Sequence, residues 1–238
     1  MIEKDIAIEL QDIEEKNLLR NREDRNKDYL NFSDNDYLGL RNNKSISRAM
    51  KKSIDKFGNG SGASHLISGH FQSHSNLELK LANILHFEDG LFYHSGFNAN
   101  VSFFKNIIKG EFDIFLDKLC HASIYDGMFS AQSPFTRYPH LDYEFLEQKL
   151  KNSTKENKII VTDSVFSMDG DIADLSRLYS LSIKYKTFLY IDDAHGFGVY
   201  GSKGLGLLES QMEVDIDRSN IINLTNYSKS AELSGAMI

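Results

Sequence analysis

The beginning of the chain shows a regular pattern of apolar and charged positions. Ile2, Ile6, Leu10, Ile13 and Leu18 recur at near-helical spacing, and most of the residues between them are charged or polar. Apolar residues three to five positions apart lie on one face of an α-helix. The pattern therefore predicts an amphipathic helix over the first 20 or so residues.

Two more helices are predicted further along, on either side of a glycine-rich segment. Ser45–Phe57 has helical spacing and begins with a residue type that caps helices, and Gly58 is well placed to end it. The following segment, up to Gly69, is rich in glycine and serine and predicts a loop. Ser75–Leu85 again has apolar residues at helical spacing.

From about residue 90 onward, short apolar runs alternate with helical patterns. The strands predicted in this part are Gly90–Tyr93, Asp113–Leu116, Lys158–Thr162, Phe188–Ile191 and Asn220–Leu224, and one more short strand is predicted earlier, at Asn31–Ser33. The predicted helices are Asn98–Lys109, a segment after Ser123, and Asp174–Tyr185. This alternation indicates the α/β class, with a mainly parallel sheet covered by helices on both faces. Ser234–Ile238 resembles a loop that enters a further strand, so we expect the chain to be a fragment of a longer protein.

The composition limits the classes of function. Apolar residues make up 41% of the 238 residues and charged residues 26%, which is typical of a globular protein with one large domain or slightly more. A net charge of −7 without a basic cluster argues against nucleic acid and anionic membranes as partners. No apolar run approaches the roughly 18 residues of a membrane span. The only cysteine, Cys120, excludes an internal disulfide, and together with a charged N-terminus that lacks a signal peptide it predicts a cytoplasmic protein.

The strongest chemical signal lies where an apolar strand ends. Asp192, Asp193 and His195 follow the predicted strand that ends at Ile191, and Lys229 lies in a polar loop downstream. Ligands of open α/β sheets bind at the carboxyl ends of the strands. A pyridoxal 5′-phosphate (PLP) site needs a lysine that forms a Schiff base and an acid that pairs with the pyridinium nitrogen. Taken singly, these residues are equally typical of a solvated strand end and a surface lysine.

Two earlier segments could contribute to the same site. Gly96 and Phe97 precede a predicted helix, and free backbone N–H groups at a helix start can hold a phosphate group. A simple strand-to-helix turn explains this segment equally well. His121 follows a predicted strand, where an exposed histidine without a function is the alternative.

Three other patterns suggest different chemistry. Gly196–Gly201 matches the G-x-G-x-x-G pattern of dinucleotide-binding folds, but Gly204 and Gly206 interrupt the helix that such a site needs. A strand ending in two aspartates resembles that of an ATPase, but the sequence contains no P-loop motif. His65, His70 and His74 could suggest a metal site, yet no carboxylate stands at the usual H-E-x-x-H position, so we expect no metal.

Over about residues 30–238 the chain resembles the α-oxoamine synthase family of PLP-dependent enzymes. The resemblance rests on six segments in the same order: Asn31–Leu40, Gly60–Gly69, Ser95–Asn100, His121–Ser123, Val165–Asp171 and Asp192–Gly206. It implies a PLP fold-type I large domain, similar to aspartate aminotransferase, at residues 45–238 after an N-terminal helix and arm at 1–44. It also implies a small C-terminal domain that this chain lacks.

The resemblance also implies roles for individual residues. Lys229, His121 and His195 are the implied catalytic residues. The implied cofactor contacts are Gly96 and Phe97 to the phosphate, His121 on the ring, Ser167 and His195 to the phenolic oxygen, Asp192 to the ring nitrogen, Thr225 to the phosphate, and Lys229 as the Schiff base. The family has a threonine three residues before the lysine, where this chain has Asn226, so a slipped loop that gives the role to Thr225 stays open.

Within the family, Gly60–Gly69 and Phe166–Asp171 are most similar to members that condense L-alanine with a pimeloyl thioester, carried by CoA or a carrier protein, in biotin biosynthesis. Members that use glycine or serine with other acyl thioesters remain alternatives, as does a non-catalytic remnant. The family implies a homodimer with a shared active site. Asn35–Gly39 and Gly60–Gly69 are then expected to face the partner.

Overall fold

The computed structural model describes residues 2–22, 30–107 and 112–238. The chain divides into two compact units, 1–34 and 35–238. In the first unit, α1 (Ile2–Glu15) confirms the predicted N-terminal helix but ends before Leu18, since Asn17 has a positive φ of 55°. The predicted strand at Asn31–Ser33 is wrong: these residues pair with no strand, and Phe32 is 94% exposed.

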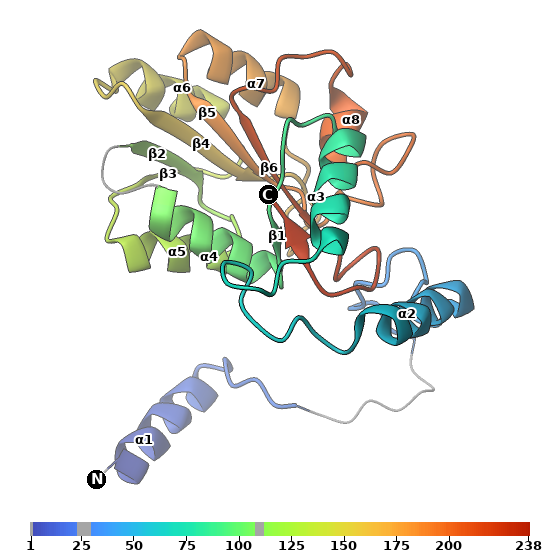
Figure 1. Cartoon of the computed structure of the whole chain (residues 1–238). Helices are drawn as coiled ribbons and strands as arrows, with labels where there is room; N and C mark the ends of the chain where they lie inside the picture. The colour runs from blue at the N-terminus through green and yellow to red at the C-terminus, as the bar shows by residue number, and fades with distance from the viewer. Residues whose placement is uncertain (1, 23–29, 108–111) are drawn as a thin grey trace. The chain divides into compact units, whose positions relative to one another are not determined.

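The second unit is built on one seven-stranded sheet (Figure 1). Its strands are β1 (Phe92–Tyr93), β2 (Asp113–Asp117), β3 (Thr136–Tyr138), β4 (Lys158–Asp163), β5 (Phe188–Asp192), β6 (Ile221–Asn226) and β7 (Ala236–Met237), in the order β1-β7-β6-β5-β4-β2-β3. β3, β2, β4, β5 and β6 are parallel, and β7 is antiparallel to both of its neighbours. The mainly parallel α/β class predicted from the sequence is confirmed.

Helices cover both faces of this sheet. The helices of this unit are α2 (Lys44–Phe57), α3 (Gln72–Leu85), α4 (Gly96–Ile107), α5 (Ala122–Ala131), α6 (Tyr143–Asn152), α7 (Leu175–Lys184) and α8 (Leu207–Gln211). Of these, α2 has no buried residue and is not among the covering helices. Figure 1 shows α4 and α5 side by side on one face of the sheet and α6 and α7 on the other. None of the helices in the described ranges is long and apolar enough to cross a membrane.

Most predicted elements from residue 45 onward are present, with shifted ends. α2 is capped by Asn43, whose side chain accepts the backbone N–H groups of Ser45 and Ile46, so Ser45 is not the cap; Gly58 ends the helix as predicted. The predicted end of α4 at Lys109 lies outside the described residues. β3 and α8 were not predicted because each is short. α6 was missed although Tyr143, Leu146 and Leu150 recur at helical spacing.

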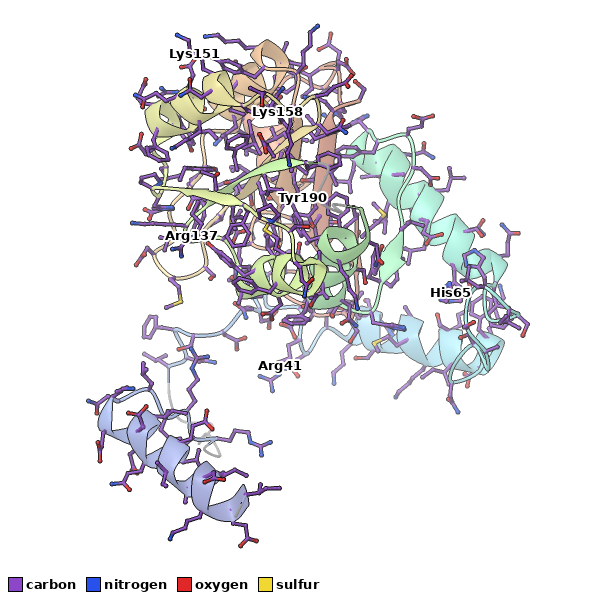
Figure 2. All side chains as sticks on the ribbon, turned by 90° about the vertical axis from the view of Figure 1, so that its left-hand side faces the viewer. Arg41, His65, Arg137, Lys151, Lys158 and Tyr190 are labelled. Atoms are coloured by element: carbon purple, nitrogen blue, oxygen red, sulfur yellow. The ribbon has the colours of Figure 1, made fainter. Side chains whose placement is uncertain are left out.

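The central strands form the core and fix the position of the site. β4 and β5 are buried apart from their first residues, as expected for parallel strands with helices on both faces. Tyr190 of β5 is fully buried against Phe103 and Phe104 of α4, and Figure 2 shows it in the middle of the sheet. α4 packs closely on α5 at Gly127, where an added Cβ would lie 2.9 Å from the Phe104 Cβ. This packing holds the start of α4 next to the carboxyl ends of β5 and β6.

Candidate active site

A cavity of about 220 Å³ opens at the carboxyl ends of β4, β5 and β6, beside the start of α4. Six of the residues singled out in the sequence line it: Gly96, Phe97, His121, Asp192, His195 and Lys229. They come from four separate segments of the chain. The parallel sheet brings them together because its strands all end at the same edge.

Asp192, the last residue of β5, is held by a buried hydrogen-bond network. Its Oδ2 accepts from Asn100 Nδ2 at 2.7 Å, and its Oδ1 accepts from the Ala194 backbone N–H at 3.1 Å. The Asn100 Oδ1 accepts from the Tyr190 hydroxyl at 2.6 Å, which fixes the amide with its NH2 group toward Asp192. The network therefore sets the orientation of the Asp192 carboxylate.

The same network reaches His121 at the start of α5. Asn100 Nδ2 donates to Ser123 Oγ at 2.9 Å, and Ser123 Oγ lies 2.7 Å from His121 Nδ1. Because His121 Nδ1 also accepts the Ser123 backbone N–H, it is the unprotonated nitrogen of the neutral ring. The proton is then on Nε2, so the tautomer of this cavity histidine is set by its contacts with α5.

A second carboxyl group, Asp163, lies beside Asp192 on the neighbouring strand. The two residues are Cα partners in the pairing of β4 with β5, and both line the cavity. Burial, together with the Asp192 charge, raises the pKa of Asp163 well above its usual range. The raised pKa favours the protonated form of Asp163, since two buried carboxyl groups side by side cannot easily both ionise.

Lys229 and His195 lie at the other side of the cavity. The Lys229 Nζ is 2.7 Å from His195 Nε2, and the Tyr37 hydroxyl is 2.6 Å from His195 Nδ1. Tyr37 donates its own proton to the Asn35 Oδ1 at 3.1 Å, so its oxygen accepts from His195 Nδ1–H. His195 Nε2 therefore carries a lone pair directed at the lysine nitrogen, and the chain of donors runs from Lys229 through His195 and Tyr37 to Asn35.

The ionisation of both residues suits a reactive amine. Burial lowers the pKa of Lys229, although the Asp192 and Asp163 carboxylates oppose the shift. Burial, with smaller effects of Lys229 and His121, lowers the pKa of His195 to about 4. A neutral imidazole and an amine that loses its proton easily are thus in direct contact.

The start of α4 faces the end of β6 at very short range. A Cβ added to Gly96 would lie 2.9 Å from the Asn226 Nδ2, so a larger residue here would displace the Asn226 side chain. Ser95, Asn226 and Ser228 also line the cavity here. Hydroxyl and amide groups next to the N–H groups of a helix start form a suitable anion site.

Two predicted cofactor contacts lie outside the cavity lining. Thr225 is fully buried, and its hydroxyl is 2.9 Å from the Tyr227 hydroxyl, whereas Asn226 lines the cavity. The position of Asn226 therefore favours it over Thr225 for a phosphate contact. Ser167 is exposed in the turn enclosed by the Val165–Ile172 bridge.

Several cavity residues were not singled out from the sequence. Asp163 had a usable signal, because it follows the predicted strand Lys158–Thr162 just as Asp192 follows Ile191. Asn100 and Tyr37 carried no signal in the sequence beyond their place in the segments that resemble the family. Their roles depend on distant residues: Asn100 contacts Asp192, 92 residues later, and Tyr37 contacts His195, 158 residues later. The G-x-G-x-x-G segment forms turns in which no helix begins, as predicted from Gly204 and Gly206.

PLP fits the donor set of this cavity. Among the residues that the structure describes, Asp192 has no cationic partner within ion-pair distance, and a pyridinium N–H is complementary to its carboxylate. The Lys229 amine suits an aldehyde, and the Gly96 helix start suits a phosphate group. The ring nitrogen, the aldehyde and the phosphate of the cofactor thus each have a matching group.

Comparisons with known proteins agree with this geometry. The family model described as aminotransferase class I and II matches residues 27–238. An 8-amino-7-oxononanoate synthase of Nitrosomonas eutropha is 41% identical over 212 residues, which cover 89% of this chain and 55% of the relative. The chain therefore spans about half the length of the curated relatives it matches.

Solved structures show the same relationship. The 8-amino-7-oxononanoate synthase of Francisella tularensis is 28% identical with a TM-score of 0.75, covering 89% of this chain and 58% of that one. A serine palmitoyltransferase from S. paucimobilis with a bound PLP–myriocin aldimine is 25% identical with a TM-score of 0.82, covering 98% of this chain and 61% of that one. With a PLP-compatible cavity on a matching fold, the chain belongs to the aminotransferase class I and II family.

Proposed function

We propose that this chain forms the PLP-binding part of an 8-amino-7-oxononanoate synthase. The reaction is the condensation of L-alanine with a pimeloyl thioester, with loss of CO2, in biotin biosynthesis. The observation that supports it most directly is the meeting of Lys229, His195, Asp192 and the α4 start in one cavity. The domain limits expected from the sequence, 1–44 and 45–238, form part of this proposal.

Each residue has a task that follows from its contacts. Lys229 binds the cofactor aldehyde through Nζ, and its lowered pKa increases the fraction of unprotonated, nucleophilic amine. Asp192, oriented by Asn100, holds the proton on the ring nitrogen. When bound, PLP supplies an electron sink for a carbanion at the substrate Cα.

The two histidines orient the reacting groups. His195 Nε2 accepts a hydrogen bond from Lys229 Nζ, because Tyr37 holds the other ring nitrogen as the donor. His121 is presented at the cavity by its contacts with Ser123 and is the proposed partner of the cofactor ring. The backbone at Gly96 and Phe97, with Asn226 in place of the family's threonine, binds the phosphate. Ser167 and Thr225 keep their predicted cofactor contacts only if their surroundings rearrange.

The choice of substrates rests on similarity. Curated relatives that are about 40% identical over 88–89% of this chain are 8-amino-7-oxononanoate synthases. Solved structures of an 8-amino-7-oxononanoate synthase and of a serine palmitoyltransferase are about equally identical to it, at 28% and 29%, so the curated relatives carry the choice. Alanine is therefore preferred to serine or glycine as the amino acid. The proposal also includes a homodimer, which the resemblance supports. It includes a cytoplasmic location, with which a single, buried cysteine agrees.

The first experiment traps the cofactor. The chain is incubated with one equivalent of PLP, treated with borohydride and analysed by peptide mass spectrometry, with circular dichroism on the same sample. We expect a reduced pyridoxyl group on Lys229, no such group in Lys229→Ala, and full labelling of Lys229 in the control Lys203→Ala, which replaces an exposed lysine. A folded sample without the adduct would refute the proposal.

The second experiment tests the substrate. Alanine, glycine and serine are added to the PLP-loaded protein, and the change in cofactor absorption is measured as a function of concentration. We expect alanine to saturate at the lowest concentration. Tighter binding of serine or glycine would assign the chain to a different α-oxoamine synthase.

A further inference from the structure

Three histidines outside the cavity lie against one another next to the start of α3. The ring centroids of His65, His70 and His74 are 4.7 to 5.4 Å apart, and one ring nitrogen of each lies within 4.8 Å of the others. Figure 2 shows His65 in the loop at this end of α3, apart from Tyr190 in the sheet. None of the three lines the cavity.

A tight turn produces this cluster. The Gly69 N–H donates to the Ser64 carbonyl at 2.9 Å, which closes the turn that separates His65 from His70. A Cβ at Gly69 would lie 1.8 Å from the Ala63 carbonyl oxygen, so only glycine permits the turn. α3 begins at Gln72, so His70 precedes the helix and His74 lies in its first turn. His70 and His74 therefore do not lie on one turn of a helix as the histidines of an H-E-x-x-H motif do, and the turn before α3 is what brings the rings together.

The contacts within the cluster are those of a preformed ligand set. His65 Nδ1 and His70 Nδ1 are 3.0 Å apart, so one proton lies between two nitrogens that could both bind a cation. His70 Nε2 is 2.7 Å from Ser75 Oγ, and a metal-binding histidine is usually oriented by such a partner on its outer nitrogen.

His74 would have to give up one contact. Its Nδ1 accepts the Phe71 backbone N–H at 2.9 Å. Ligation through Nδ1 displaces this donor, and ligation through Nε2 requires the ring proton to move to Nδ1.

We propose that His65, His70 and His74 form a site for a divalent transition metal of the Zn²⁺ type. Imidazole nitrogens suit zinc, cobalt, nickel and copper, whereas calcium and magnesium prefer oxygen ligands. Three protein ligands leave a fourth position for solvent. The site is distinct from the proposed PLP site, and it does not depend on the function proposed for that cavity.

A bound metal would fix the turn to α3. Leu66 and Ile67 stand at the tip of this turn and are 96% and 82% exposed. Two ligands come from either side of the turn and the third from the helix, so metal binding restricts the movement of this apolar tip relative to α3.

The test measures metal binding directly on the untagged chain. Zn²⁺ is titrated by calorimetry and its stoichiometry determined by elemental analysis after dialysis, and Co²⁺ is used for its visible spectrum. We expect one Zn²⁺ per chain, a tetrahedral Co²⁺ spectrum, and slower amide hydrogen exchange in residues 61–71 with metal. His65→Gln, His70→Gln and His74→Gln should each weaken binding by about 100-fold, and Ser75→Ala by about 10-fold.

The controls separate this site from other histidines. His86→Asn replaces an exposed histidine in the left-handed conformation that asparagine tolerates, and it should bind Zn²⁺ like the parent chain. Circular dichroism verifies the fold of each variant, and PLP trapping on Lys229 in the same samples shows whether the cavity is intact. Absence of stoichiometric Zn²⁺ binding, or binding that survives replacement of all three histidines, would overturn the proposal.

Discussion

The chain has two regions where histidines gather, and they are built in different ways. In the cavity, His121 and His195 are placed by strand ends and a helix start that a buried core supports. In the loop before α3, the ring of His65 meets that of His70 because of a turn that depends on Gly69. The cavity therefore tolerates little change around it, whereas the loop cluster depends on few interactions.

The difference is clearest in what each histidine contacts. His195 is in contact with Lys229 and with Tyr37, which lies 158 residues earlier in the chain. Within the described residues, the hydrogen bonds and ring contacts of the loop histidines join positions fewer than ten apart. Long-range contacts of the first kind form only when the whole sheet has assembled, so we expect substitutions in the cavity to have larger effects.

The largest expected effect is on cofactor binding by Asp192→Asn. An amide cannot balance a pyridinium charge, and loss of one partner of a buried ion pair costs about 3–5 kcal/mol, so PLP affinity should fall by about 100-fold or more. The matched control is Asp193→Asn, since Asp193 is adjacent but outside the cavity and accepts the Leu207 N–H at 3.2 Å. Affinity is measured by absorbance titration with PLP. Equal losses in the two variants would show that general damage at the strand end, and not the ring contact, explains the effect.

The next effect is on stability, through Tyr190→Phe. The substitution removes the 2.6 Å hydrogen bond to the buried Asn100 and leaves that amide oxygen without its donor. We expect a loss of about 1–3 kcal/mol in the free energy of unfolding, measured by urea denaturation. The control is Tyr179→Phe, whose hydroxyl donates to the Asp217 carbonyl oxygen at the surface. Equal stability of Tyr190→Phe and Tyr179→Phe would show that a buried hydrogen bond in the cavity network contributes no more than one at the surface.

The sequence was sufficient for the parts of the site that depend on strand ends. The runs Phe188–Ile191 and Ile159–Val161 are continuously apolar, so the strands and the position of the acid follow from local pattern. The pairing of Asp163 with Asp192 and the contact of Tyr37 with His195 depend on which strands become neighbours, and that order is set by packing over the whole domain. The three loop histidines were noticed in the sequence, but the missing H-E-x-x-H carboxylate led to the expectation of no metal. That their rings meet depends on the turn at Gly69, which the spacing does not reveal.

Acid should destabilise the cavity region through His195. Burial lowers the pKa of His195 to about 4 from the 6.5 that is usual for histidine. Between these two pH values the folded state therefore binds fewer protons than the unfolded state. The stabilising contribution is complete above pH 6.5 and is lost as the pH falls through 4. After allowance for solvent screening, we expect about 1–2 kcal/mol.

A second group in the same region acts in the opposite direction. Burial raises the pKa of Asp193 to about 7 from 3.8, so its contribution is complete below pH 3.8 and is lost as the pH rises through 7. Urea denaturation of His195→Gln and Asp193→Asn across pH 4–7 separates the two. Relative to the parent chain, His195→Gln should lose less stability on acidification and Asp193→Asn more. If the free energy of unfolding changed with pH in both variants as it does in the parent chain, neither group would have the shifted pKa expected from its burial.

The smallest effect is expected for Ser75→Ala without metal, and it provides the sharpest contrast with Tyr190. Both substitutions delete one hydroxyl from a short hydrogen bond, 2.7 Å for Ser75 to His70 and 2.6 Å for Tyr190 to Asn100. His70 is exposed, so water replaces the lost partner, and the free energy of unfolding should change by less than about 0.5 kcal/mol. Urea denaturation in the presence of a chelator measures this change. A loss as large as that of Tyr190→Phe would mean that the loop before α3 is as tightly integrated as the sheet edge, and the distinction between the two histidine regions would fail.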